Sequence, residues 1–433
     1  MNNKHWIVLA ITPILFSCGS TPATSSASSL STGENSSAQS LELSSDVSAT
    51  SSEAKINNPY VYNYPHSEQV MHLANSFYSL GRSSFEDFNE LLQYSGENIV
   101  LSPASYILTV AGISSTSINF PNEAFGLNED ASLDFKAMLE AWNFEYDHKV
   151  DSDWIIDEDY CSFLSTFAVQ QVGDSYPFDE DKREAFSDKY ISTLQSDLSS
   201  YHADAEYFFH DLLNFSIPVP DPRLSSDGVI CYGGLKMKDY VPNGLDSAKK
   251  PFKNEAVDSY VFGTEMFPKN LHYYHGDHYE VFRVEINYTD LVIVLPEEGT
   301  NINDVSPFDA YAAFRNNRGS AHAMGYIPYF HLTTEEEDLT SIVANKMTGN
   351  EVFFDKLLAD GVENDLSLSR VLQTSDFEFN EYGVSGESIT VAGFEGSSGP
   401  EEAEVIELNV NRPFYAISEM DNFPIFVNKV INL

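Results

Sequence analysis

Residues Asn380 to Ala392 read NEYGVSGESITVA and lie shortly before the end of a long chain. The small and β-branched side chains of this stretch are compatible with a strand, because such residues pack well on a pleated surface. Its glycines and polar neighbours favour instead a loosely held segment. The next stretch, FEGSSGPEEAE (Phe394 to Glu404), has no periodicity, and a strand pattern resumes only at VIELNV. The sequence therefore predicts a strand-competent segment that continues into a long flexible loop.

The N-terminus predicts where the protein works. A polar start with one lysine precedes the apolar run WIVLAITPILF and then Ser17-Cys18-Gly19, which is the layout of a signal peptide. The run is too short for a comfortable membrane span. The ending Leu15-Phe16-Ser17-Cys18 resembles a bacterial lipoprotein box, so residues 1–18 are predicted to be a lipoprotein-type signal in which Cys18 becomes lipidated. Phenylalanine is less usual at its place in that box, and a plain secretory signal is the alternative.

Residues 19–58 are rich in serine, threonine and alanine and contain no aromatic residue. Such a segment cannot offset the entropy lost on ordering, so it is predicted to be a disordered tether. Aromatic and apolar residues recur past Pro59, and residues 59–433 are predicted to form the folded domain. The expected location is the cell surface or outer membrane, with lipid on Cys18 as the only membrane contact. Secretion is the alternative.

Composition excludes several classes of partner. The chain has 433 residues and a formal net charge of −43, which disfavours binding to nucleic acid, anionic lipid headgroups and acidic polysaccharides. Besides Cys18 only Cys161 and Cys231 are present, so at most one disulfide bond can form. No internal repeat is visible, and we expect one large domain that works as a monomer.

Hydrophobic periodicity predicts helices together with large antiparallel sheets, the α+β class. Helical spacing runs through residues 68–81 and 85–94, and a strand-like IVL precedes Ser102-Pro103, which suits the cap and first turn of a helix. Residues 258–296 and the C-terminal segments read as strands. Thr334 to Glu337 fits a capping box, which predicts that another helix begins there.

Catalytic constellations are sparse. The motif GVSGE (Gly383 to Glu387) misses the G-x-S-x-G nucleophile elbow, because a glutamate stands where the second glycine is required. In HYYHGDHYE the tyrosines and the glycine favour a strand, on which His275 points away from His272 and His278 and the ligand set is broken. We therefore predict no enzyme activity, no metal site and no cofactor.

Five stretches together resemble the serpin family. They cover most of Asn98 to Leu433 in the order that the family has, and the match is weak only between Ser152 and Asp239. The resemblance implies an α+β serpin-like fold with three β-sheets, a helical N-terminal half and an exposed reactive-centre loop. The matching stretches are NIVLSPASYILTVAGIS, MFPKNLHYYHGDHYEVFRVEINYTDLVIVLPEEGTNINDV, IPYFHLTTEEEDLTSIVANKM, DLSLSRVLQTSDFEFNEYG and VNRPFYAISEMDNFPIFVNKVINL.

The resemblance also implies a function for the loop. In inhibitory serpins a protease cuts the loop, whose N-terminal part then inserts as a new strand of the largest sheet and drags the attached protease along. If Val384 faces inward, alternation puts small residues inward up to Phe394 and turns Glu387 outward, so the sequence permits insertion. The hinge residues implied for this loop are Glu381, Gly383, Val384, Ser385, Gly386, Ser388 and Thr390.

Several positions depart from the family pattern. The hinge has Val384 where threonine is usual and lacks the alanine run, and Gly386 and Gly393 weaken a strand. Gln373 stands in place of the histidine that locks the sheet opening, and Cys231 in place of the nearby asparagine. Because glutamine both donates and accepts hydrogen bonds, the lock is expected to be remodelled around Gln373 with Ser102 or Ser105.

The bond that the protease would cut can be located by counting loop residues from either end, and the two counts give different positions. Counting forward from the hinge gives Ser397–Ser398, and counting back from Arg412 gives a bond near Glu402. The stretch from Asn380 to Asn411 contains no arginine or lysine, which excludes trypsin-like targets and favours elastase-like or subtilisin-like enzymes. A glutamate-specific protease is the second candidate.

Two functions from different classes follow. The first is a surface-anchored serpin that inhibits a serine or cysteine protease by suicide trapping. The second is a non-inhibitory serpin-like lipoprotein that acts as a binding or structural module. Small inward residues in the loop favour the first function, and the altered hinge and lock favour the second.

Overall fold

The computed structural model describes residues 68–145, 161–241, 244–286, 288–347, 354–362, 365–387, 405–420 and 423–433. The predictions for the signal peptide, Cys18, the tether and the loop between residues 388 and 404 lie outside these residues. No helix in the described part of the chain is long and apolar enough to cross a membrane.

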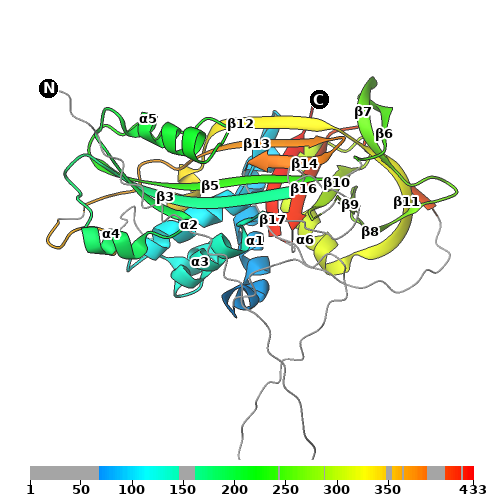
Figure 1. Ribbon diagram of the computed structural model, residues 1–433. Helices are drawn as coiled ribbons and strands as arrows, with labels where there is room; N and C mark the ends of the chain where they lie inside the picture. The colour runs from blue at the N-terminus through cyan, green and yellow to red at the C-terminus, as the bar shows by residue number, and fades with distance from the viewer. Residues whose placement is uncertain are drawn as a thin grey trace, which may run out of the picture. The chain divides into compact units, whose positions relative to one another are not determined.

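A seven-stranded sheet carries residues 380–387, the described part of the predicted strand NEYGVSGESITVA (Figure 1). The two longest strands of this sheet, β3 and β5, pair antiparallel along almost their whole length. β4 pairs parallel with the other edge of β3. In spatial order the strands are β12 (Phe330–Asp338), β13 (Leu372–Asn380), β14 (Gly383–Glu387), β5 (Gly228–Tyr240), β3 (Cys161–Val172) and β2 (Phe144–Glu145), with β4 (Ile191–Ser196) beside β3.

The remaining strands form a ten-stranded sheet that holds most of the fully buried apolar residues of the C-terminal half. In order they are β1 (Ile99–Leu101), β17 (Phe423–Val430), β16 (Phe414–Met420), β10 (Asp290–Pro296), β9 (Tyr279–Glu285), β8 (Lys269–His275), β11 (Gly319–Pro328), β7 (Glu255–Phe262) and β6 (Ser247–Phe252), with β15 (Val405–Asn409) beside β11.

The resemblance implied three sheets, but hydrogen bonding among the described residues connects the strands into two. The cause is β11, which pairs with β8 near its start and with β7 further along the same strand. The α+β class and the predicted strands between residues 258 and 296 are confirmed.

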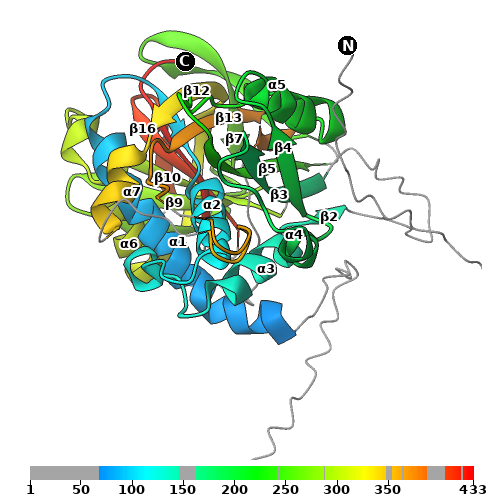
Figure 2. The ribbon, with the colours of Figure 1, turned by 90° about the vertical axis from the view of Figure 1, so that its left-hand side faces the viewer.

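Helices cover both faces of the seven-stranded sheet. In Figure 1, α2 and α3 lie below the sheet and α5 lies above it, and Figure 2 shows α1 next to α2. The helices are α1 (Glu68–Tyr94), α2 (Pro103–Thr116), α3 (Ala131–Ala141), α4 (Glu180–Phe186), α5 (Tyr201–Glu206), α6 (Pro307–Asn317) and α7 (Thr340–Lys346), with the short 3₁₀ helices η1 (Asn122–Phe125) and η3 (Ile302–Asp304) and the π-helix η2 (Tyr207–Leu212).

The apolar core is divided in two by the seven-stranded sheet. The larger cluster lies between the two sheets and helices α1 to α3, and the smaller one lies under α5 and η2 on the outer face of β3 and β5. Helix α2 approaches β5 closely because Gly233 has no side chain: a Cβ there would lie 2.2 Å from Oγ1 of Thr109. This close approach makes α2 the floor beneath the centre of the seven-stranded sheet.

The prediction that a helix begins at Thr334 is wrong, whereas the predicted helix cap at Ser102 is confirmed. Residues Thr334 to Glu337 belong to β12, where Thr334 and Glu337 pair with β13 on either side of a register shift, and α7 begins only at Thr340. Long-range strand pairing overrides the local capping-box pattern here. The Ser102 side chain accepts a hydrogen bond from Ser105 N at the start of α2, with Pro103 in the first turn.

Candidate functional site

The predicted strand NEYGVSGESITVA begins, at Gly383–Glu387, as strand β14 in the middle of the seven-stranded sheet. β13 turns at Glu381 and Tyr382, and β14 then runs back between β13 and β5. Gly386 pairs with Phe377 on one side and with Met237 on the other. The first hinge residues therefore already occupy the centre of the sheet.

Side chains alternate along β14 as the sequence predicts. Val384 is fully buried and Gly386 is buried, while Ser385 between them is only half-buried. The glycine has a steric role, because a Cβ at residue 386 would lie 2.7 Å from Cε2 of Phe426 in β17. The sequence predicted only that Gly386 weakens the strand. The steric role of this glycine could not be predicted, because it depends on how the two sheets pack against each other.

A groove follows β14 in the direction of the loop. β14 pairs with β5 only from Met237 to Tyr240, so among the described residues the rest of β5, from Gly228 onward, has no strand on that edge. β13 likewise pairs with β14 only from Asp376 to Asn380. The space between the two strands belongs to a cavity of about 420 Å³.

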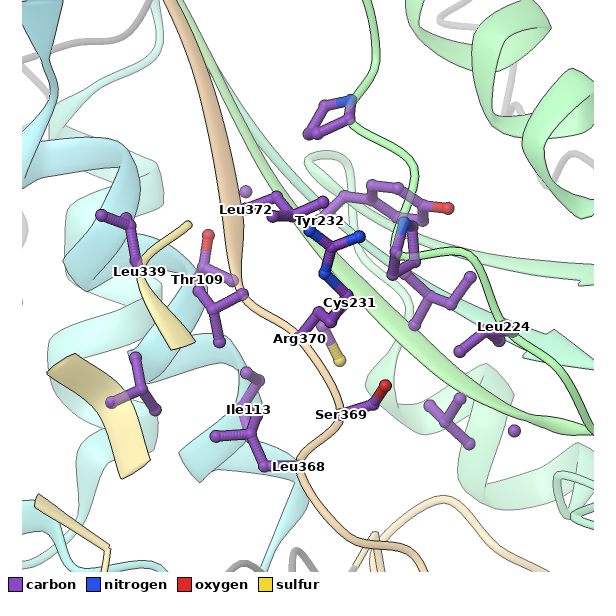
Figure 3. A pocket seen from close by; sticks show the side chains of 18 of the residues that line it. Thr109, Ile113, Leu224, Cys231, Tyr232, Leu339, Leu368, Ser369, Arg370 and Leu372 are labelled. Carbon is purple, nitrogen blue, oxygen red and sulfur yellow. The ribbon is translucent and has the colours of Figure 1, made fainter. Parts of the chain in front are cut away.

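Side chains from several elements meet in this groove, as Figure 3 shows. Helix α2 supplies the floor, β5 one wall, and the chain leading into β13 the other wall. Most of the lining is apolar, with a few hydroxyl groups and one guanidinium. The residues labelled in the figure are Thr109, Ile113, Leu224, Cys231, Tyr232, Leu339, Leu368, Ser369, Arg370 and Leu372.

Gln373 connects β13 to the start of α2. Its side-chain Oε1 accepts a hydrogen bond from Ser102 N at 2.8 Å, and its Nε2 donates to Ser102 O at 2.9 Å. Ser105 binds the opposite wall of the groove: its hydroxyl donates a hydrogen bond to Gly233 O of β5 at 3.0 Å. The three residues expected at the lock thus lie together, and both walls of the groove are tied to α2.

The cysteine of the groove is a free thiol. Cys231 lies on β5, where burial raises the pKa of its thiol well above the usual range. Cys161 pairs with Asp239 of β5, eight residues along the strand from Cys231. At ~3.3 Å per residue this separation is roughly 26 Å, so the disulfide that composition allowed is excluded by the strand register.

Asp239 is a further residue of this region that sequence reasoning missed. It is fully buried and pairs with Val384 of β14. Its Oδ2 accepts hydrogen bonds from Tyr288 N, Thr289 N and Thr289 Oγ1 at 2.9, 2.8 and 2.7 Å. The carboxylate fixes the end of β5 where the hinge enters, and only the β5–β14 register brings the two segments together.

Other predicted site residues fall elsewhere. Ser388, Thr390, Ser397, Ser398 and Cys18 lie outside the described residues. No metal-binding group of three or more suitable side chains is present in the described part of the chain.

The predicted directions of the histidines in HYYHGDHYE are wrong. The motif forms the β8–β9 hairpin rather than one strand, so His278 lies in the turn. His275 Nε2 and His278 Nδ1 are 3.8 and 3.4 Å from the carboxylate oxygens of Glu297, and both histidine side chains are exposed. The turn reverses the alternation that a single strand would impose.

Comparisons with known proteins agree with this geometry. The serpin (serine protease inhibitor) family profile matches residues 247–433, which include strands β12, β13 and β14 of the seven-stranded sheet. No curated protein matches the chain significantly in sequence.

Solved serpin structures match over most of the chain. Human thyroxine-binding globulin complexed with thyroxine is 13% identical, with a TM-score of 0.61, covering 84% of this chain and 99% of its own. Serpin48 of the insect Tenebrio molitor is 15% identical, with a TM-score of 0.61 and coverage of 84% and 98%. Tengpin, a thermophilic serpin in its native state, is 15% identical, with a TM-score of 0.61 and coverage of 84% and 94%. The chain therefore has the serpin fold, and its residues 247–433 match the serpin family profile.

Proposed function

We propose that this protein inhibits a serine or cysteine protease by inserting its cleaved loop into the groove between β5 and β13. One observation carries the proposal: β14 starts a strand at the centre of the sheet and points along a groove between the free edge of β5 and the start of β13 with the chain leading into it. Completing that strand would form backbone hydrogen bonds with β5 and, as far as Leu372, with β13, and it would bury apolar surface. The stabilisation is about 1 kcal/mol per residue, on the order of 8 kcal/mol for residues 388–395.

If the loop inserts, continuing the register of β14 gives each loop residue an expected position in the groove. Because Gly386 pairs with Met237 and Phe377, each step forward along the loop is one step back along β5 and β13. Thr390 would then lie between Gly233 and Gln373. The last paired residue would be Glu395, opposite Gly228 at the start of β5.

The chemistry of the groove suits these residues. Ser388 would lie next to Ser375, whose buried Oγ has no hydrogen-bond partner among the described residues. Phe394 would lie next to Val229, at the end of the groove that Phe120 and Leu366 line. A small polar residue thus meets an unsatisfied hydroxyl, and the single large inward residue meets the apolar end.

The target class follows from the loop sequence. Since no arginine or lysine lies between Asn380 and Asn411, we expect complexes with elastase-like or subtilisin-like proteases and none with trypsin. The protein should be mixed with trypsin, chymotrypsin, elastase, subtilisin and a glutamate-specific enzyme. SDS-stable complexes are scored on gels, and the cut is located by mass spectrometry.

The outcomes of this panel separate the candidates. A covalent complex cut at Ser397–Ser398 supports the forward count of the loop, and a cut near Glu402 supports the glutamate-specific target. Tight trypsin inhibition through this loop would contradict the specificity argument. Turnover by every protease without any complex would favour the non-inhibitory binding or structural module.

We also propose that the protein is held at the cell surface by lipid on Cys18. The support is the signal-like apolar run that ends in a lipoprotein-like box, followed by a long polar tether. The variant Cys18→Ala is expected to appear in the soluble fraction, while the wild-type protein sediments with membranes. A variant that still sediments with membranes refutes the anchor.

A further inference from the structure

A proline-rich segment lines the outer side of the groove. We name residues 215–224 the strap; it contains Pro218, Pro220 and Pro222, and it leads from η2 toward β5. Proline fixes φ and favours an extended backbone in the residue before it, so the strap is stiff. Figure 3 shows Leu224, at its end, on the side of β5.

One side of the strap is tied to α5 and η2. Phe215 packs edge-on against Phe209, with ring centroids 5.4 Å apart. His210 Nε2 and His202 Nε2 are 2.8 and 3.0 Å from the carbonyl oxygens of Ile217 and Val219. The strap therefore belongs to the half of the sheet that contains β3, β4 and β5.

The other side of the strap holds β12. Arg223 Nη2 is 2.7 Å from Glu336 Oε2, and Asp221 N donates to Glu336 Oε1 at 3.2 Å. The Asp221 carboxylate is held in turn by Tyr201, whose hydroxyl donates to its Oδ1 at 2.6 Å. Glu336 N donates to Thr374 Oγ1 of β13 at 3.3 Å, so these contacts link α5 to β12 and β13 across the groove.

Backbone strain falls on the two charged partners. Arg223 has a φ of 56° and Glu336 a φ of 47°, and both are non-glycine residues in the left-handed region. Glu336 also lies in the irregular part of β12, where the register with β13 shifts between Thr334 and Glu337. Strain of this kind persists only where surrounding contacts hold it, and it is often associated with switching elements.

We propose that Arg223, Asp221 and Glu336 form a clasp that restrains the separation of β13 from β5. The inference rests on the proposed function, because it assigns to the clasp the rate at which a cleaved loop enters the groove. Releasing the clasp removes an ion pair and a hydrogen bond to a charged group and relaxes two strained residues. The clasp thereby sets the balance between two outcomes of loop cleavage. Either the protease stays trapped, or it is released free and the protein is left as a cleaved substrate.

Hydrogen exchange of the intact protein measures groove opening without any protease. Arg223→Ala and Glu336→Ala are expected to speed exchange of the amides of residues 229–235 and 372–375 about tenfold, the effect of losing one charge-assisted contact. Alanine, like glutamate, is an L-residue with a Cβ, so the substitution at residue 336 does not relieve the strain of its left-handed backbone conformation. Glu336→Gln keeps the acceptor for Asp221 N and is expected to show an intermediate rate.

A matched pair controls for loss of surface charge. Lys249 and Asp258 form an exposed ion pair of 2.5 Å between β6 and β7, away from the groove, and Lys249→Ala is expected to leave these exchange rates unchanged. The double variant of Arg223 and Glu336 should exchange no faster than Glu336→Ala, because that single variant already removes the ion pair with Arg223 together with the hydrogen bond from Asp221 N. In 1 M salt the exchange rate of the wild-type protein should move toward that of Arg223→Ala, since the side chain of Arg223 is 64% exposed and that of Glu336 is 34% exposed.

Equal exchange in the wild-type protein, Arg223→Ala and Glu336→Ala overturns the clasp, whatever the inhibitory activity. A faster rate in both variants supports it even if no protease in the panel is trapped, and that second result would count against the proposed function alone. If a variant does not fold, as judged by circular dichroism, the salt comparison on the wild-type protein decides the same question.

Discussion

Arginine in place of Thr390 is expected to convert the protein from a trap into a substrate. If the loop inserts, the β14 register would point residue 390 inward between Gly233 and Gln373, where Thr109 of α2 already fills the space above Gly233. Burying an unpaired guanidinium there costs several kcal/mol. Because each 1.4 kcal/mol changes a ratio about tenfold, the number of molecules consumed per protease inhibited should rise by roughly tenfold or more.

The measurement is a titration of a protease that the wild-type protein traps, with intact complex and cleaved inhibitor quantified on gels. Ser385→Arg is the matched control, since Ser385 is only half-buried on the outward side of β14 and tolerates a charge. If Thr390→Arg traps the protease as efficiently as the control, residue 390 does not enter the groove and the register argument is wrong.

The sequence predicted well those features that depend on short-range patterns. Alternation identified Val384 and Gly386 as inward-facing, because a strand fixes side-chain direction residue by residue. The cap at Ser102 and the buried strand ending at Pro296 likewise follow from neighbouring residues. The resemblance to serpins predicted that Gln373 lies near Ser102, and two hydrogen bonds join these residues in the structure.

Features that depend on distant pairing were not predictable. Glu336 was assigned to a helix from its local pattern, but it lies in the irregular part of β12, between residues that pair with β13. The strap lies in the stretch between Ser152 and Asp239, where the resemblance is weakest. Asp239 acquires its role only through the β5–β14 register and the backbone amides of Tyr288 and Thr289.

Cleavage of the loop in an otherwise folded protein tests whether residues 388–395 complete the strand begun by β14. A protease that cuts between Phe394 and Glu402 leaves the inserting segment attached to β14 and free to enter the groove. With a gain on the order of 8 kcal/mol, the melting temperature of the cleaved protein should rise by roughly 10 °C or more. Cleaved Thr390→Arg should show little or no rise, because its inserted strand would bury the charge.

The most direct measurement is therefore the melting temperature of the cleaved wild-type protein against that of the intact protein, with mass spectrometry to prove a single cut. If the cleaved loop inserts, the melting temperature of the wild-type protein should rise strongly on cleavage, and Thr390→Arg should abolish that rise. An unchanged melting temperature after a clean single cut would contradict insertion and leave a serpin fold that does not trap proteases.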